Sequence, residues 1–219
     1  ATYVTAQKVA DSTKKKLYNT ALYGIAWDRD VQLVLPAGEA SANRVGPKFG
    51  LDFDLMQGGV EVKVNGYMLQ EAKGTVLDSF NQVAATKAKF QQIQAGTRVR
   101  ADKFISGWKM PIELTGSVGI SSAKGESTLD YASTAINAGL YVGLFKRFSL
   151  LAGYQTITGA DKVFSVNRNE TNLAAGIEFK IQEGAALVAM FNQLKTEFPN
   201  ATEYNFDQNI LSTKIAVSF

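Results

Sequence analysis

The stretch Asn209-Ile210-Leu211-Ser212-Thr213-Lys214-Ile215-Ala216-Val217-Ser218-Phe219 decides the fold of this chain. Counted back from Phe219, every second residue is Phe, Val, Ile, Thr or Leu, whereas the residues between them are Ser, Ala, Lys and Ser. Side chains of a β-strand point alternately to opposite faces of the sheet. The segment therefore predicts a strand with one apolar face and one mostly polar face.

The same period of two recurs along the chain. In the clearest case, the apolar residues of the segment 136–144 alternate with Asn137, Gly139, Tyr141 and Gly143. Segments of this kind predict ten strands. Their approximate bounds are 18–28, 47–57, 59–70, 90–101, 110–121, 134–145, 147–158, 170–181, 184–195 and 208–219.

The connections between these strands carry a second pattern. The short connections are 57–59, 102–107, 146–147 and 182–184, and the long ones are 29–46, 71–89, 122–133, 159–169 and 196–207. Short and long connections thus alternate, as they do when successive turns lie at opposite ends of an up-and-down barrel. The alternative is a soluble β-sandwich or lipocalin-like barrel, in which the apolar face of each strand would point inward.

Composition excludes several classes of chemistry. The chain has no cysteine and no histidine, so it lacks disulfides, thiolate nucleophiles and the commonest metal ligand and general base. The net charge of +3 is too small to indicate nucleic-acid binding. No segment approaches the roughly 20 apolar residues that a membrane-spanning helix needs, although strands of roughly 9–11 residues also cross a bilayer.

The terminal strand, the period of two and the order of the connections resemble bacterial outer-membrane β-barrels, whose closing strand ends in Phe. The resemblance covers about residues 18–219. It implies a closed antiparallel up-and-down transmembrane β-barrel of about ten strands, within a range of eight to twelve, with short periplasmic turns and long extracellular loops. Residues 1–17 are expected to form a periplasmic N-terminal arm. Because the chain starts at Ala1 without a leader, we expect the signal peptide to have been removed.

Two sets of residues are candidates for function. The membrane-insertion signal would consist of Leu211, Thr213, Ile215, Val217 and Phe219. A lumen charge network would consist of Asp52, Asp54, Glu61, Lys63, Arg98, Arg100, Glu113, Glu178, Lys180 and Lys214. These charges would either pair into salt bridges that fill the barrel or form the wall of a narrow polar pore.

Outer-membrane barrels include proteases, phospholipases and acyltransferases, and those of this size generally use a catalytic histidine. Because this chain has none, we expect it not to be an enzyme. The motif Ser121-Ser122-Ala123-Lys124 matches Ser-x-x-Lys, but it does not begin a helix and reads as a coincidence. No cofactor and no metal are expected.

The resemblance favours a non-enzymatic outer-membrane barrel with a structural or surface-interaction role. The alternatives are a small porin-like diffusion channel and an accessory barrel of a larger envelope complex. The expected partners are outer-membrane lipid, lipopolysaccharide, the barrel assembly machinery and a protein of an envelope complex, with no nucleic acid among them.

Overall fold

One antiparallel β-sheet makes up the computed structural model, which describes residues 44–71, 87–125, 130–163, 165–182 and 185–217. Its strands are β1 (Arg44–Val45), β2 (Lys48–Leu55), β3 (Val60–Glu71), β4 (Lys89–Arg100), β5 (Ile112–Lys124), β6 (Asp130–Gly143), β7 (Phe148–Asp161), β8 (Val166–Gln182), β9 (Ala185–Glu197) and β10 (Phe206–Val217). Two single-turn 3₁₀ helices, η2 (Ala101–Lys103) and η3 (Thr202–Tyr204), lie in connections.

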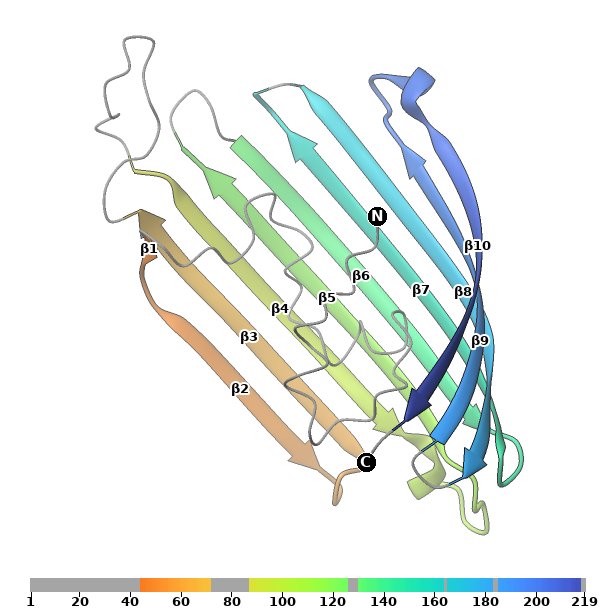
Figure 1. Cartoon of the computed structure of the whole chain (residues 1–219). Helices are drawn as coiled ribbons and strands as arrows, with labels where there is room; N and C mark the ends of the chain where they lie inside the picture. Colours follow the sequence, from red (N-terminus) through yellow and green to blue (C-terminus); the bar gives the residue numbers. More distant parts are fainter. Residues whose placement is uncertain (1–43, 72–86, 126–129, 164, 183–184, 218–219) are drawn as a thin grey trace.

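From β3 onward, each strand pairs with the next one in the chain, and Figure 1 shows the resulting curved sheet with its strands side by side. Strands β1 and β2 both pair with β3, one after the other along the same side. The ten strands therefore occupy nine side-by-side positions in the sheet, here called ribbons. Gly46 and Pro47 separate β1 from β2, and the Pro47 carbonyl still accepts a hydrogen bond from the Met68 N–H at 3.0 Å. The two pieces therefore act as one interrupted edge ribbon.

Nine of the ten expected strands are confirmed, and they correspond to β2 through β10. The expected strand 18–28, the arm 1–17 and Phe219 lie outside the described residues. No helix within the described part of the chain is both long and apolar enough to cross a membrane.

The strict alternation of short and long connections is wrong. The expected long connections 122–133 and 159–169 shrink to 125–129 and 162–165, and the connection 101–111 is longer than either. Strand pairing continues beyond the apolar segments, with Lys124 opposite Asp130 and Asp161 opposite Val166. Ladder hydrogen bonds join backbone groups and need no apolar side chains, so polar ends of strands remain paired.

The expected closed barrel is not seen either, since no ladder joins β10 to β1 or β2 in the described residues. Neighbouring strands are antiparallel throughout, so the two edges of a sheet nine ribbons wide run in the same direction. Antiparallel closure therefore requires an odd number of additional ribbons. The described residues supply the wall of a barrel without its closing ribbon.

The two faces of the sheet differ as they do in a membrane barrel. On one face, here called the apolar face, large side chains such as Phe53, Ile136 and Leu211 are exposed, Leu211 by 77%. On the other, here called the polar face, Asn137 is buried and Glu178 is 0% exposed. A soluble sandwich or lipocalin-like barrel would bury its apolar face, so this distribution contradicts the soluble alternative.

Two small apolar clusters interrupt the polar face. One consists of Tyr67, Leu69, Ala88, Phe90 and Ala123. The other consists of Tyr141, Leu151, Ala174, Val188 and Met190. The buried core of the described residues thus lies on the polar face, together with buried hydroxyl and amide groups.

Candidate functional site

The ten charged residues singled out from the sequence share the polar face. Partners in an antiparallel ladder point to the same side of the sheet. Asp54 lies opposite Glu61, which in turn lies opposite Arg98 on its other flank. Arg100 lies opposite Glu113. The register of the ladders places the remaining members on the same face, namely Asp52, Lys63, Glu178, Lys180 and Lys214.

These charges gather near one end of the sheet. Asp54 is the residue before the last of β2, Glu61 is the second residue of β3, and Arg100 ends β4. That end carries the connections 56–59, 101–111 and 144–147. The polar face therefore bears a band of both signs of charge beside these connections, whereas hydroxyl and amide groups dominate its middle.

Arg98 and Glu61 form the clearest ion pair of the band. The Arg98 Nη2 donates to Glu61 Oε1 at 2.7 Å and to Oε2 at 2.5 Å. The two side chains are 27% and 22% exposed. A partly desolvated charge-assisted pair of this kind fixes both side chains. That the pair belongs to a lumen network stays a prediction.

Asp54 contacts the turn that follows β2, and its place in the charge network stays a prediction. Its Oδ1 accepts a hydrogen bond from the Gly58 N–H at 2.6 Å. Met56, Gln57 and Gly58 all have positive φ angles, which only glycine adopts without cost. Asp54 therefore stabilises the left-handed turn between β2 and β3.

Glu178 is the most deeply buried charge. Its Oε1 accepts a hydrogen bond from the Tyr141 hydroxyl at 3.1 Å and lies 4.0 Å from Lys180 Nζ. The Ser149 hydroxyl donates to the Tyr141 oxygen at 2.8 Å. A buried carboxylate requires such partners. The alternation had indicated the face of Tyr141, but neither Tyr141 nor Ser149 was recognised as part of a charged site.

The part of the sheet that the structure describes holds neither a cluster of metal ligands nor an intact Ser-x-x-Lys arrangement. Within the described residues, no three or more histidine, cysteine, aspartate or glutamate side chains gather as metal ligands would. Ser121 contacts Ser133, oxygen to oxygen at 2.8 Å, and is buried. Lys124 is three residues along the same strand and so points to the opposite face, which separates the two members of the Ser-x-x-Lys motif.

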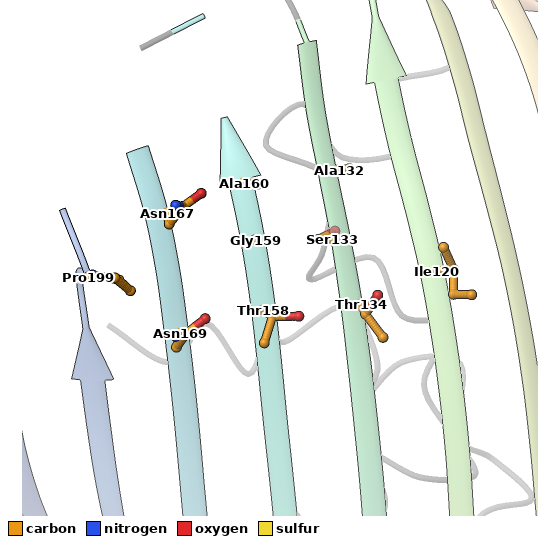
Figure 2. Close-up of a pocket in the computed structure, with 10 residues that line it drawn as sticks. All are labelled: Ile120, Ala132, Ser133, Thr134, Thr158, Gly159, Ala160, Asn167, Asn169 and Pro199. Carbon is orange, nitrogen blue, oxygen red and sulfur yellow. The ribbon is translucent and has the colours of Figure 1, made fainter. Parts of the chain in front are cut away.

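A shallow depression lies at the opposite end of the sheet (Figure 2). Its lining comes from β5 to β8 together with Pro199. Four of the lining residues belong to the apolar face and pair from strand to strand. Ile120 lies opposite Thr134, Thr134 lies opposite Thr158, and Thr158 lies opposite Asn169. None of the charged residues of the polar face lines this depression.

The candidate insertion signal lies in β10. Leu211 and Ile215 are exposed on the apolar face, and Thr213 has the same parity. Val217 belongs to the same strand, and Phe219 lies outside the described residues. Recognition of these residues by an assembly machinery stays a prediction.

Comparison with known proteins identifies the fold. No protein-family model and no curated protein sequence matches the chain. Among solved structures, the chain is similar to a loop-deletion mutant of OmpT, an outer membrane protein of Vibrio cholerae, with a TM-score of 0.57 and 12% identity over 81% of this chain and 55% of that one. It is also similar to OmpT folded in vitro, in its trimer form, with a TM-score of 0.51 and 11% identity over the same shares.

These likenesses show the fold of an outer-membrane β-barrel, and the chain spans about half the length of the structures it matches. The exposed apolar face agrees with that fold. The expected family resemblance and the location in the bacterial outer membrane are thus confirmed.

The comparisons also correct one prediction. The absence of histidine led us to expect that the protein is not an enzyme. The neighbours, however, are proteins named OmpT with the outer-membrane barrel fold, and outer-membrane barrels include proteases. The prediction therefore does not stand.

Proposed function

We propose that the protein forms the wall of a porin-like outer-membrane barrel that lets small polar solutes and ions pass. The charged band of the polar face carries this proposal. Asp52, Asp54 and Lys214 are exposed, and Lys63 and Arg100 are half-buried, so most charges of the band remain accessible to water. Charged and hydroxyl-bearing walls lower the cost of moving an ion out of bulk water.

The extent of the sheet supports a passage as well. The diameter of a barrel grows with its number of strands. Nine ribbons leave the sheet open, and the sheet resembles part of a barrel formed by a longer chain. A barrel of more ribbons than the nine described would leave a lumen with space beyond the wall side chains.

A second candidate is an occluded barrel with a structural or envelope-partner role, which includes an accessory barrel of a larger complex. Burial of the polar face over β5 to β9 favours it. Thr115, Asn137, Glu178 and Thr196 have little or no exposed surface. Groups buried in this way do not border open water, so this part of the wall fits a filled lumen better than a wide one.

Single-channel conductance of the refolded protein in a planar bilayer separates the two functions. A passage predicts steady current steps from the wild type. The variant Arg98→Ala with Arg100→Ala should increase the cation preference of the current, since both positive charges leave the wall and the carboxylates remain. Lys195→Ala, at the other end of β9 and exposed, serves as the matched control and should leave the ion preference unchanged.

Two outcomes of the conductance measurement would contradict the passage. A wild type that folds, as judged by heat-modifiable migration, and still conducts no current would refute the passage. A current that appears only after Arg98→Ala with Arg100→Ala would favour the occluded barrel, because it would identify the charged band as the obstruction.

A further inference from the structure

Three connections at the charged end of the sheet form a continuous rim. These are 56–59, 101–111 and 144–147. The Lys103 Nζ donates to the Gln57 carbonyl at 2.5 Å, which joins the first connection to the second. The Gly143 N–H donates to the Pro111 carbonyl at 2.7 Å, which joins the second connection to the base of the third. The rim therefore extends along the sheet from β2 to β7.

Exposed aromatic and aliphatic side chains project from this rim. Phe145 is 70% exposed, and Phe104, Ile105, Trp108 and Leu144 are exposed as well. They lie where the apolar face of the strands ends. Aromatic side chains at that level are typical of residues in the headgroup region of a bilayer.

The rim is also cationic. Lys103, Lys109, Lys146 and Arg147 are exposed, and the single acid of the three connections is Asp102. The Asp102 Oδ1 accepts a hydrogen bond from the Ile112 N–H at 3.2 Å, so this carboxylate is engaged with the backbone.

The opposite end of the sheet has a different balance. There, Arg168 forms an ion pair with Glu170, and Lys195 forms one with Glu197 at 2.7 Å. The connections at that end, 72–88, 125–129, 162–165 and 198–205, balance their charges, with Lys73, Lys87 and Lys162 against Asp78, Glu126 and Glu203. Four exposed cations against one engaged acid distinguish the rim and make it complementary to an anionic surface.

We propose that the rim binds the headgroups of anionic phospholipids in the leaflet that it meets. Lysine and arginine near a membrane surface are attracted to anionic lipid, and their aliphatic stems can lie along apolar surface while the charge reaches the phosphates. The cations of the rim are interleaved with Phe104, Trp108 and Phe145, which enter the same headgroup region. An acidic protein would complement the charges but would not need aromatic side chains at the boundary of the apolar face.

Trp108 provides a reporter inside the rim. The chain has two tryptophans, so Trp27→Phe leaves Trp108 as the single one. The refolded single-tryptophan protein is placed in phosphatidylcholine vesicles that contain brominated phosphatidylglycerol or, in parallel, brominated phosphatidylcholine. The proposal predicts a relative binding constant about 2–5-fold in favour of the anionic lipid at low salt, as expected for a few surface cations. Salt should reduce that preference.

Replacement of the four cations by Gln (K103Q, K109Q, K146Q and R147Q) should abolish the preference. If this variant does not fold, K146Q with R147Q alone should halve the preference for anionic lipid, since the third connection is exposed throughout. The matched control is K124Q with K162Q, at the other end of the sheet, which should leave the preference for anionic lipid intact. Equal quenching by both lipids in the parent protein, or an anionic preference that survives loss of the cations, would overturn the proposal. Channel conductance does not enter this test.

Discussion

At the scale of single residues, the Arg98–Glu61 pair tests whether the charged band stabilises the sheet. Both side chains are more than two-thirds buried, and Arg98 donates to both carboxylate oxygens. We expect a double-mutant cycle of Arg98→Ala and Glu61→Ala to give a coupling free energy of about 1–2 kcal/mol in thermal or urea unfolding from detergent. Because the charges face each other across β3 and β4, each single variant should also unfold at a lower temperature.

The exposed pair Lys195–Glu197 is the control for this cycle. Its Nζ and Oε1 lie 2.7 Å apart, but both side chains are open to solvent. Solvent screening should leave little coupling there. Equal coupling in the two pairs would show that partial burial of Arg98 and Glu61 does not matter.

Ile177 and Thr171 provide a second test at residue scale. Both lie on the apolar face of β8, with Ile177 in the middle of the apolar segment 173–181 and Thr171 beyond its end. Ile177→Arg should destabilise the protein in a bilayer by about 2–4 kcal/mol, as a charge near the bilayer midplane does. Thr171→Arg should cost far less. Similar free energies of unfolding for the two variants would place the membrane boundary elsewhere.

At the scale of strands, the period of two was sufficient to locate nine strands and to assign side chains to faces. It could not predict the ends of the strands, because polar residues such as Lys124 and Asp130 pair through backbone groups. Nor could it predict the contact between Tyr141 on β6 and Glu178 on β8, which crosses β7. Such a contact depends on sheet curvature, and alternation carries no information about curvature.

The two ends of the strands should lie on opposite sides of the membrane. The chain has no cysteine, so single cysteines introduced at Lys146 and at Thr202 give unambiguous labels. With short connections in the periplasm, a membrane-impermeant thiol reagent should label the cysteine at Thr202 in intact cells and spare the one at Lys146. Labelling only at Lys146 would reverse the orientation.

At the scale of the whole molecule, closure requires ribbons that the described residues do not contain. The edges at β2 and β10 run in the same direction, and open edges carry unpaired backbone groups that a bilayer does not tolerate. We expect residues 18–28 to contribute a closing ribbon, in agreement with their alternation in the sequence. The sequence pattern alone leaves this untested, since closure depends on contacts between the first and last strands.

Two deletions test that expectation. Removal of residues 1–17 should leave a barrel with heat-modifiable migration, because those residues were expected to form an arm. Removal of residues 1–28 should abolish that migration, because the closing ribbon is lost as well. A protein that folds equally well after both deletions would contradict a role of 18–28 in closure.

The most direct test of the account is the accessibility of β4 to water, position by position. Single cysteines at residues 95 to 100 would be exposed to a charged, water-soluble thiol reagent in reconstituted vesicles. Gly96, Arg98 and Arg100 belong to the polar face, and Ala95, Thr97 and Val99 to the apolar face. The account predicts reaction at 96, 98 and 100 and protection at 95, 97 and 99. Uniform reactivity, or the reverse alternation, would contradict a water-lined polar face enclosed by a lipid-facing apolar one.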